Sequence, residues 1–377
     1  MAKSQKANTE QNDFFNFQKH LCEELSRLKK YSSSIDFLME QNKKVVNDFF
    51  FDNLFMLYQS TFNLNVNPQS REDIKYMWNN LILYHYTDSP SLEKIISGQS
   101  LKLNCILKMN DSGEGQALII NILQQLTDMF SKNKSINMDD VFTGLSFANK
   151  VLALQTIMYS FSFTTLKDDA SQWARYGKPK ENPEPKTEIE KNPCGICIEV
   201  PMKNLLKLVK AINDDFDLAE ITPILYIPNY NTNNTFLKFI KSIIDLRLKK
   251  EKSSEFSKYV SHYSSDIKHE SFKKEYEVRL LLSLKHQNNV TNMVAFHPKY
   301  VEHISDAKDQ CIILKLAEKL QNFNFTDLFS SITFGPETSP EAARCVEEFL
   351  EKKELSSLRP QNSKCTLRSV PHKDKNK

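Results

Sequence analysis

Hydrophobic positions in the first 79 residues recur at helical spacing. In the stretch 14–31, FFNFQKHLCEELSRLKKY, apolar side chains return every three or four residues, which is the stripe of an amphipathic helix. The stretch 33–62 continues in the same manner, and the first 97 residues contain no glycine. The pattern predicts an all-α accessory region over residues 1–79, whose helices offer a surface for oligomerisation.

From residue 80 the pattern changes to short apolar runs separated by helix signals. The run 82–87, ILYHYT, is typical of a strand, and residues 89–98 are typical of a helix with an Asp or Ser cap and a glycine stop. Further strands are predicted at 100–104, 157–164, 195–200, 221–227, 276–284, 310–316 and 330–335, and helices within 116–155 and at 205–212, 235–265 and 339–353. The pattern predicts an α+β domain over residues 80–355, followed by a basic, polar and disordered tail at 356–377.

Composition and charge bound the function only loosely. The formal net charge is +3 in 377 residues, so nothing in the whole-chain charge demands nucleic acid or an acidic partner. No apolar run reaches the roughly 20 residues that span a bilayer, and the polar N-terminus lacks a signal-peptide core. Seven scattered cysteines do not form a disulfide framework. We expect a reduced, cytoplasmic protein with no membrane partner.

A lone C-x-x-C motif at Cys194 and Cys197 is a poor metal site. Both residues belong to a predicted strand, on which positions three apart point to opposite faces. A structural zinc site needs four ligands in one place. We therefore expect two structural cysteines and no metal.

The most polar strand pattern is KKEYEVRLLLSL, at residues 273–284. On a continuous strand Glu275, Glu277 and Arg279 would share one face. Three adjacent charged side chains usually form a solvated face, where an ion pair contributes little. If they line a cleft instead, Arg279 would hold Glu277 ionised and oriented.

Two other predicted strands carry one polar and one apolar face. His85 and Thr87 alternate with tyrosines in the first strand, and Ser160 and Ser162 alternate with Tyr159, Phe161 and Phe163 in residues 157–164. A lone histidine among aromatic residues is more often a packed core residue than a catalytic one. A face that turns polar at the end of a strand is also what the wall of a ligand site requires.

These segments together resemble a bacterial family known as domain of unknown function 2971 (DUF2971). The resemblance rests on Tyr84-His85-Tyr86-Thr87, the run from Ile95 to Leu103, Asn110 to Glu114, Ser160-Phe161-Ser162, the box from Trp173 to Gly177, and Glu275 to Arg279. It covers roughly residues 80–352 and leaves out the N-terminal helices. For Trp173 itself we expect core packing.

The order of these motifs is in turn similar to the ADP-ribosyltransferase superfamily. His85 with Thr87 resembles its H-x-T first strand, Ser160 to Ser162 resembles S-T-S, and Glu275 with Glu277 resembles E-x-E. The central Phe161 departs from the serine motif, and the combination mixes features of the histidine and arginine classes. The resemblance implies a split mixed β-sheet core surrounded by helices.

The resemblance also implies a reaction and a role for each residue. NAD would be the substrate, and cleavage of its nicotinamide–ribose bond passes through an oxocarbenium-like state that a carboxylate stabilises. Glu277, oriented by Arg279, would supply that carboxylate, and Glu275 would assist the acceptor. His85 and Thr87 would bind the other ribose and the diphosphate, with Tyr86 beside them although it points away from the His85 face. Ser160 and Ser162 would support the carboxylate, and Tyr176 would stack on nicotinamide.

The resemblance therefore implies an enzyme that transfers ADP-ribose from NAD to an unknown protein or nucleic acid, in a bacterial toxin, effector or phage-defence component. Two alternatives stay open. One is a non-catalytic module that binds a nucleotide or a macromolecule. The other is an NAD glycohydrolase that uses the same site without an acceptor.

Overall fold

The computed structural model describes the segments 79–109, 157–178, 184–227, 265, 267–287, 294–296, 298–305, 310–319, 325–358 and 360–365. The chain divides into two compact units. The first comprises residues 1–75, 106–157 and 223–274, and the second comprises residues 76–105, 158–222 and 275–377. Two segments inside the predicted 80–355 domain thus belong to the first unit. The helices predicted within 1–79, 116–155 and 235–265 lie outside the described residues.

The described part of the first unit is small. It contains the 3₁₀ turn η1 (Ile106–Lys108), the strands β6 (Leu225–Ile227) and β7 (Ile267–His269), and most of the 3₁₀ segment η3 (Glu270–Glu275). β6 and β7 pair in parallel, with Tyr226 opposite Lys268.

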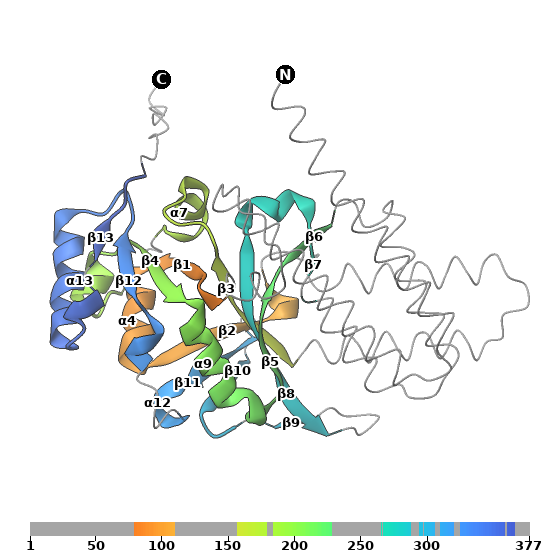
Figure 1. Cartoon of the computed structure of the whole chain (residues 1–377). Coiled ribbons are helices and arrows are strands. Elements are labelled where there is room, and N and C mark those ends of the chain that lie inside the picture. The colour runs from red at the N-terminus through yellow and green to blue at the C-terminus, as the bar shows by residue number, and fades with distance from the viewer. Residues whose placement is uncertain are drawn as a thin grey trace, which may run out of the picture. The chain divides into compact units, whose positions relative to one another are not determined.

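The second unit is built on one large sheet, to which the described segments contribute eleven strands (Figure 1). These are β1 (Ile82–Asp88), β2 (Ser100–Cys105), β3 (Met158–Thr164), β4 (Gly195–Pro201), β5 (Phe216–Pro223), β8 (Glu277–Gln287), β9 (Val294–Phe296), β10 (Val301–Ser305), β11 (Gln310–Lys315), β12 (Ser331–Phe334) and β13 (Gln361–Asn362). The order is β10-β11-β2-β3-β1-β4-β12-β13, and β8 also pairs with β3, β5 and β9. The β12–β13 pair is parallel whereas β1–β4 and β3–β8 are antiparallel, so the sheet is mixed.

Six α-helices accompany the sheet in the described segments: α4 (Ser89–Gly98), α7 (Ala170–Tyr176), α8 (Glu188–Lys191), α9 (Met202–Ile212), α12 (Leu316–Lys319) and α13 (Pro340–Lys352). Three further 3₁₀ turns are η2 (Asn213–Asp215), η4 (Phe325–Leu328) and η5 (Ser356–Leu358). α4 contacts β1 and β2, and α9 contacts β4. The mixed α+β content predicted from the sequence is therefore confirmed. None of the helices in the described segments has the length and apolar composition needed to cross a bilayer.

Local sequence signals account for α4. The Asp88 carboxylate accepts a hydrogen bond from the Ser91 amide at 2.8 Å and so caps the first turn. Pro90 stands in that first turn, where its missing N–H costs nothing. The helix ends at Gly98, and Gln99 takes the left-handed conformation (φ 43°) that terminates many helices.

β1 and β3 are joined at a single position, Tyr84 opposite Thr164, whereas β1 pairs with β4 along its whole length. Beyond that position the His85 imidazole bridges the two strands, with Nδ1 2.9 Å from the carbonyl oxygen of Ser162. β1 and β3 are therefore neighbours in the sheet that are joined by one backbone pair and one side-chain bridge.

The chain after residue 355 differs from the disordered tail predicted for 356–377. Ser356–Leu358 form η5, and β13 pairs with Thr333 and Phe334 of β12. Residues 366–377 lie outside the described residues.

Candidate functional site

Polar side chains from β3 and β8 lie on one face of the sheet. Ser162 is directly opposite Arg279, and Thr164 is directly opposite Glu277. Residues directly opposite each other in an antiparallel pair point to the same face, so these four side chains and Ser160 share it. Glu277 is 4% exposed, Arg279 is fully buried, and Ser160 and Thr164 are buried as well. The interpretation of this charge run as a solvated surface face is wrong, because Glu277 and Arg279 both lie in the interior.

Glu277 and Arg279 form a two-point ion pair. The Arg279 Nε lies 2.7 Å from Oε1 of Glu277, and a terminal nitrogen lies 3.3 Å from Oε2. A guanidinium in this geometry keeps a buried carboxylate charged and fixes its plane. The pair was predicted from the two-residue spacing, and the structure brings it together.

Glu275 does not share the strand with Glu277, which corrects the prediction of three charges on one strand face. Glu275 ends η3, Tyr276 takes a left-handed conformation (φ 46°), and β8 begins at Glu277. The turn is held because Thr164 Oγ1 donates to the Glu275 carbonyl at 2.7 Å and Thr165 N donates to the Tyr276 carbonyl. Strand alternation therefore does not apply across Tyr276.

The buried Glu275 carboxylate is instead held by helix α7. Arg175 donates to Oε1 at 2.8 Å, and the Tyr176 hydroxyl donates to the same oxygen at 3.2 Å. Burial, followed by the charges of Glu275 and Glu277, raises the pKa of Tyr176, so the phenol stays protonated and donates. Tyr176 remains 43% exposed. An accessible aromatic ring thus lies beside two carboxylates.

His85 lies on the other face of the sheet. Tyr84 shares the Thr164 face because it is directly opposite Thr164, so the next residue points the other way. The His85 ring stacks on Phe161 with centroids 4.2 Å apart. Burial lowers its pKa to about 4, so the imidazole is neutral at pH 7, and its Nδ1 proton is donated to the Ser162 carbonyl. Thr87 shares this face, and neither side chain meets Glu277 across the strands.

The Tyr86 side chain is hydrogen-bonded and packed inside the protein. Its hydroxyl donates to the Leu166 carbonyl at 3.0 Å and accepts from the Asp169 amide at 2.9 Å. Its ring packs edge-on against Trp173, with centroids 4.7 Å apart. Burial raises the pKa of Tyr86, and the side chain fixes the loop that leads into α7.

Trp173 is 2% exposed, as expected for a core residue, and lies against three glycines. A Cβ on Gly177 would meet the indole at 2.4 Å, and one on Gly335 would meet it at 3.3 Å. A Cβ on Gly195 would be 2.2 Å from the Gly177 carbonyl oxygen. Three of the seven glycines therefore serve the close approach of backbone to one indole.

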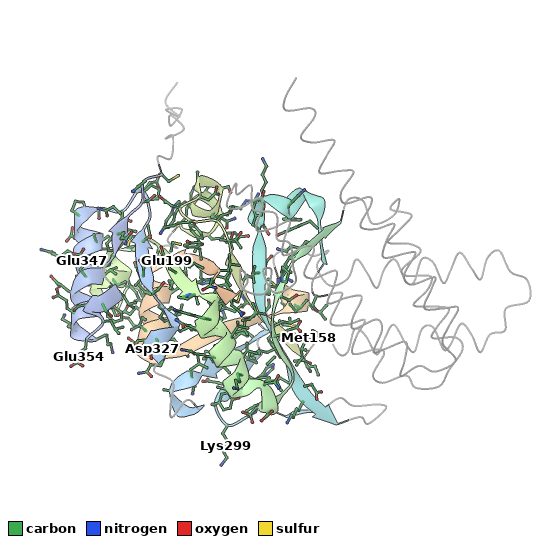
Figure 2. The ribbon with its side chains drawn as sticks, viewed as in Figure 1. Met158, Glu199, Lys299, Asp327, Glu347 and Glu354 are labelled. Carbon is green, nitrogen blue, oxygen red and sulfur yellow. The ribbon has the colours of Figure 1, made fainter. Side chains whose placement is uncertain are left out.

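The sequence analysis did not single out Glu199, on β4. It is directly opposite Tyr84, so Glu199, Tyr84, Thr164 and Glu277 form one row across four strands. Figure 2 labels Glu199 on β4. The side chain is largely buried, and Lys167 Nζ lies 2.7 Å from its Oε1. The sequence feature that could have indicated this residue is its charge within the otherwise apolar run GICIEV.

The cysteines of the C-x-x-C motif are both buried, as expected for structural residues. Burial raises the pKa of the Cys197 thiol, which packs among Tyr84, Tyr86 and Trp173. Within the described segments no group of three or more His, Cys, Asp or Glu side chains is arranged to hold a metal ion.

The fold and site thus define an α+β protein with a large mixed sheet and two buried carboxylates, of which Glu275 is held by the short helix α7. Residues 172–280 match the model of the family described as "Protein of unknown function (DUF2971)". The match supports the family expected from the sequence, and it covers most of α7 together with β4, α9 and the Glu275–Arg279 motif. No curated protein and no solved structure matches the chain.

Proposed function

We propose that this protein is an ADP-ribosyltransferase-like enzyme that cleaves the nicotinamide–ribose bond of NAD and transfers ADP-ribose to a protein or nucleic acid. One observation carries the proposal. The accessible ring of Tyr176 is hydrogen-bonded to Glu275, beside the buried Glu277–Arg279 pair. An aromatic face and carboxylates are the groups that recognise a cationic aromatic ring attached to a sugar, as the nicotinamide riboside of NAD is.

Glu277 is the group proposed to stabilise the reacting ribose. Loss of nicotinamide leaves positive charge on the sugar, and a fixed carboxylate nearby lowers the energy of that state. Arg279 keeps Glu277 ionised and orients its plane, since both carboxylate oxygens contact the guanidinium. Ser162, directly opposite Arg279, and Ser160 support the pair from β3.

Glu275 and Tyr176 take the remaining roles on this face. Glu275 would accept the proton of the attacking acceptor, because it lies outside β8 and is held by two hydrogen bonds from the edge of α7. Tyr176 would stack on the nicotinamide ring.

The role of His85 is narrower than the resemblance implied. A neutral imidazole whose Nδ1 proton is donated to Ser162 has only an acceptor at Nε2. It can accept a hydrogen bond from a ribose hydroxyl, but it cannot donate one to a diphosphate oxygen. Because His85 and Thr87 lie on the face of the sheet opposite to Glu277, we leave both the ribose and the diphosphate contacts out of this site.

The test measures free nicotinamide after incubation of the full chain with NAD. Glu277→Gln should lower the rate about a hundredfold or more, the range typical for removal of one transition-state group. Glu302→Gln is the matched control, since this exposed glutamate on β10 forms an exposed ion pair with Lys315 at 3.0 Å. Tyr176→Ala is a second variant, because an exposed ring can be removed without opening the core.

A non-catalytic binding module is the second candidate. It is favoured by the contact of both Glu277 oxygens with Arg279, because the charge of this buried carboxylate is then compensated inside the protein without a substrate. If NAD binds but no nicotinamide is released with any acceptor, the protein is a binding module and the proposed enzyme activity is excluded. Nicotinamide release without labelled ADP-ribose on protein or nucleic acid would indicate a glycohydrolase.

A further inference from the structure

We infer that residues 361–365, named here the C-terminal segment, fix helix α7 in place through Asp168, which acts as a positioning residue for the buried Glu275 carboxylate. The effect on catalysis rests on the proposed function. The effect on α7 does not, because it follows from contacts among described residues alone.

The C-terminal segment is seated on the edge of the sheet. β13 pairs in parallel with β12, Gln361 opposite Thr333 and Asn362 opposite Phe334. The Ser363 amide then donates to the Phe334 carbonyl at 3.1 Å. In Figure 1 this part of the chain runs beside β12 towards the end of the sheet where α7 lies.

One carboxylate joins this segment to α7. Oδ2 of Asp168 accepts from the Lys364 amide at 2.7 Å, and Oδ1 accepts from the Ser363 hydroxyl and, at 2.8 Å, from the Trp173 indole N–H. Burial raises and these hydrogen bonds lower the pKa of Asp168, and the net shift is downward, as expected for an ionised acceptor. Asp168 also has a left-handed backbone (φ 47°), which aspartate tolerates better than most residues.

The last residue of the segment packs under the same helix. Cys365 lies against the buried cluster of Tyr84, Tyr86, Trp173 and Cys197. Its amide donates to the Ser363 hydroxyl at 3.0 Å, which closes the segment around the Asp168 carboxylate.

α7 depends on these contacts because it is short. A helix of seven residues is not stable by itself in water, so its position is set by tertiary packing. The residues that hold it are Trp173 and the Asp169 cap, whereas the residues that it presents to Glu275 are Arg175 and Tyr176. Release of the C-terminal segment should therefore loosen both groups that hold Glu275.

The test removes one hydrogen bond at a time. Lys364→Pro deletes the amide that donates to Asp168, and Lys364→Ala keeps that amide while removing the same exposed side chain. Asp168→Asn removes one acceptor oxygen but tolerates the left-handed backbone. Removal of residues 360–377 deletes the whole segment, and removal of residues 368–377 is its control.

Amide hydrogen exchange gives a readout that needs no activity. Exchange within 170–177 should rise about ten- to hundredfold in Lys364→Pro, in Asp168→Asn and in the longer truncation, because each loses hydrogen bonds to a charged group. Residues 277–287 of β8 should exchange as in the wild type, which shows that the sheet is intact. Unchanged exchange in 170–177 for both Lys364→Pro and the longer truncation would overturn the inference.

Steady-state kinetics with NAD tests the positioning role. Loosening Tyr176 weakens the proposed stacking on nicotinamide, so KM for NAD should rise about fivefold or more, and loosening Glu275, the proposed base, should lower kcat as well. A merely unstable protein would lose active molecules, which lowers kcat and leaves KM unchanged. A lower kcat with an unchanged KM would overturn the positioning role. Unchanged kinetics despite faster amide exchange in 170–177 would overturn it as well. If the wild type releases no nicotinamide but α7 exchange rises, the proposed function fails and the structural link stands.

Discussion

The guanidinium of Arg279 contacts both carboxylate oxygens of Glu277 inside the sheet, at 2.7 and 3.3 Å. Arg279→Met would leave the Glu277 charge buried without its guanidinium, and the free energy of unfolding should fall by about 3–5 kcal/mol. The double variant Glu277→Gln with Arg279→Met should recover part of this loss, because no charge is then stranded. Urea denaturation of the purified chain measures both.

Arg344→Met is the control for that experiment. Arg344 and Glu348 form an exposed pair on α13 at 3.8 Å, and its loss should change stability by less than about 0.5 kcal/mol. An equal loss of unfolding free energy in Arg279→Met and Arg344→Met would contradict the burial of the Glu277–Arg279 pair.

Gly195→Ala should destabilise the protein by about 1–3 kcal/mol or more, because the new methyl group would overlap the Gly177 carbonyl oxygen at 2.2 Å. Gly98→Ala is the comparison, since among the described residues its methyl group would meet the Ser100 hydroxyl at 2.8 Å, which can rotate away, and alanine favours the helix. Thermal denaturation distinguishes the two variants. A Gly195→Ala protein as stable as Gly98→Ala would disprove the close packing around Trp173.

His85 should make the protein less stable as the pH falls from about 6.5 towards 4. The unfolded imidazole binds a proton below its usual pKa near 6.5, whereas the folded one stays neutral down to about 4. The unfolded state therefore binds more protons in this window, and by linkage the free energy of unfolding drops by about 2 kcal/mol at pH 5.

The contribution of His85 is isolated by comparing the wild type with His85→Gln at pH 7 and pH 5. The variant should lose about 2 kcal/mol less between the two pH values than the wild type does. The same pH dependence in both proteins would show that His85 is not the buried neutral group.

Tyr86→Phe should lower the free energy of unfolding by about 1–3 kcal/mol, because the Leu166 carbonyl and the Asp169 amide each lose a partner. Tyr176→Phe should cost less, since this side chain is partly exposed to water. Chemical denaturation compares the two. If Tyr86→Phe is fully stable but weakens NAD binding, Tyr86 contacts the nucleotide, as the sequence resemblance implied.

Much of the second unit could be predicted from periodicity. The run ILYHYT and the signals around Gly98 predicted β1 and α4 to within one residue, because strand alternation, an Asp cap and a glycine stop act locally. The mixed α+β character follows from the same signals. β10 and β13 were not predicted, because their short polar sequences become strands only by pairing with β11 and β12.

The candidate site was less predictable for physical reasons. The spacing of Glu277 and Arg279 does not indicate whether the pair is buried, since burial depends on what covers the strand. The turn at Tyr276 has no glycine or asparagine to announce its positive φ, so Glu275 was placed on the strand. Arg175, Lys167 and Asp168 act through contacts with residues far along the chain, which no local pattern contains.

The His85–Ser162 bridge means that an imidazole joins two neighbouring strands beside the backbone pair of Tyr84 and Thr164. A ladder of backbone hydrogen bonds has a fixed spacing of about 4.8 Å whatever the sequence. A bridge made by a side chain is instead open to change by substitution at one position. The contact between β1 and β3 can therefore be altered by a substitution at His85 while every strand keeps its place in the order.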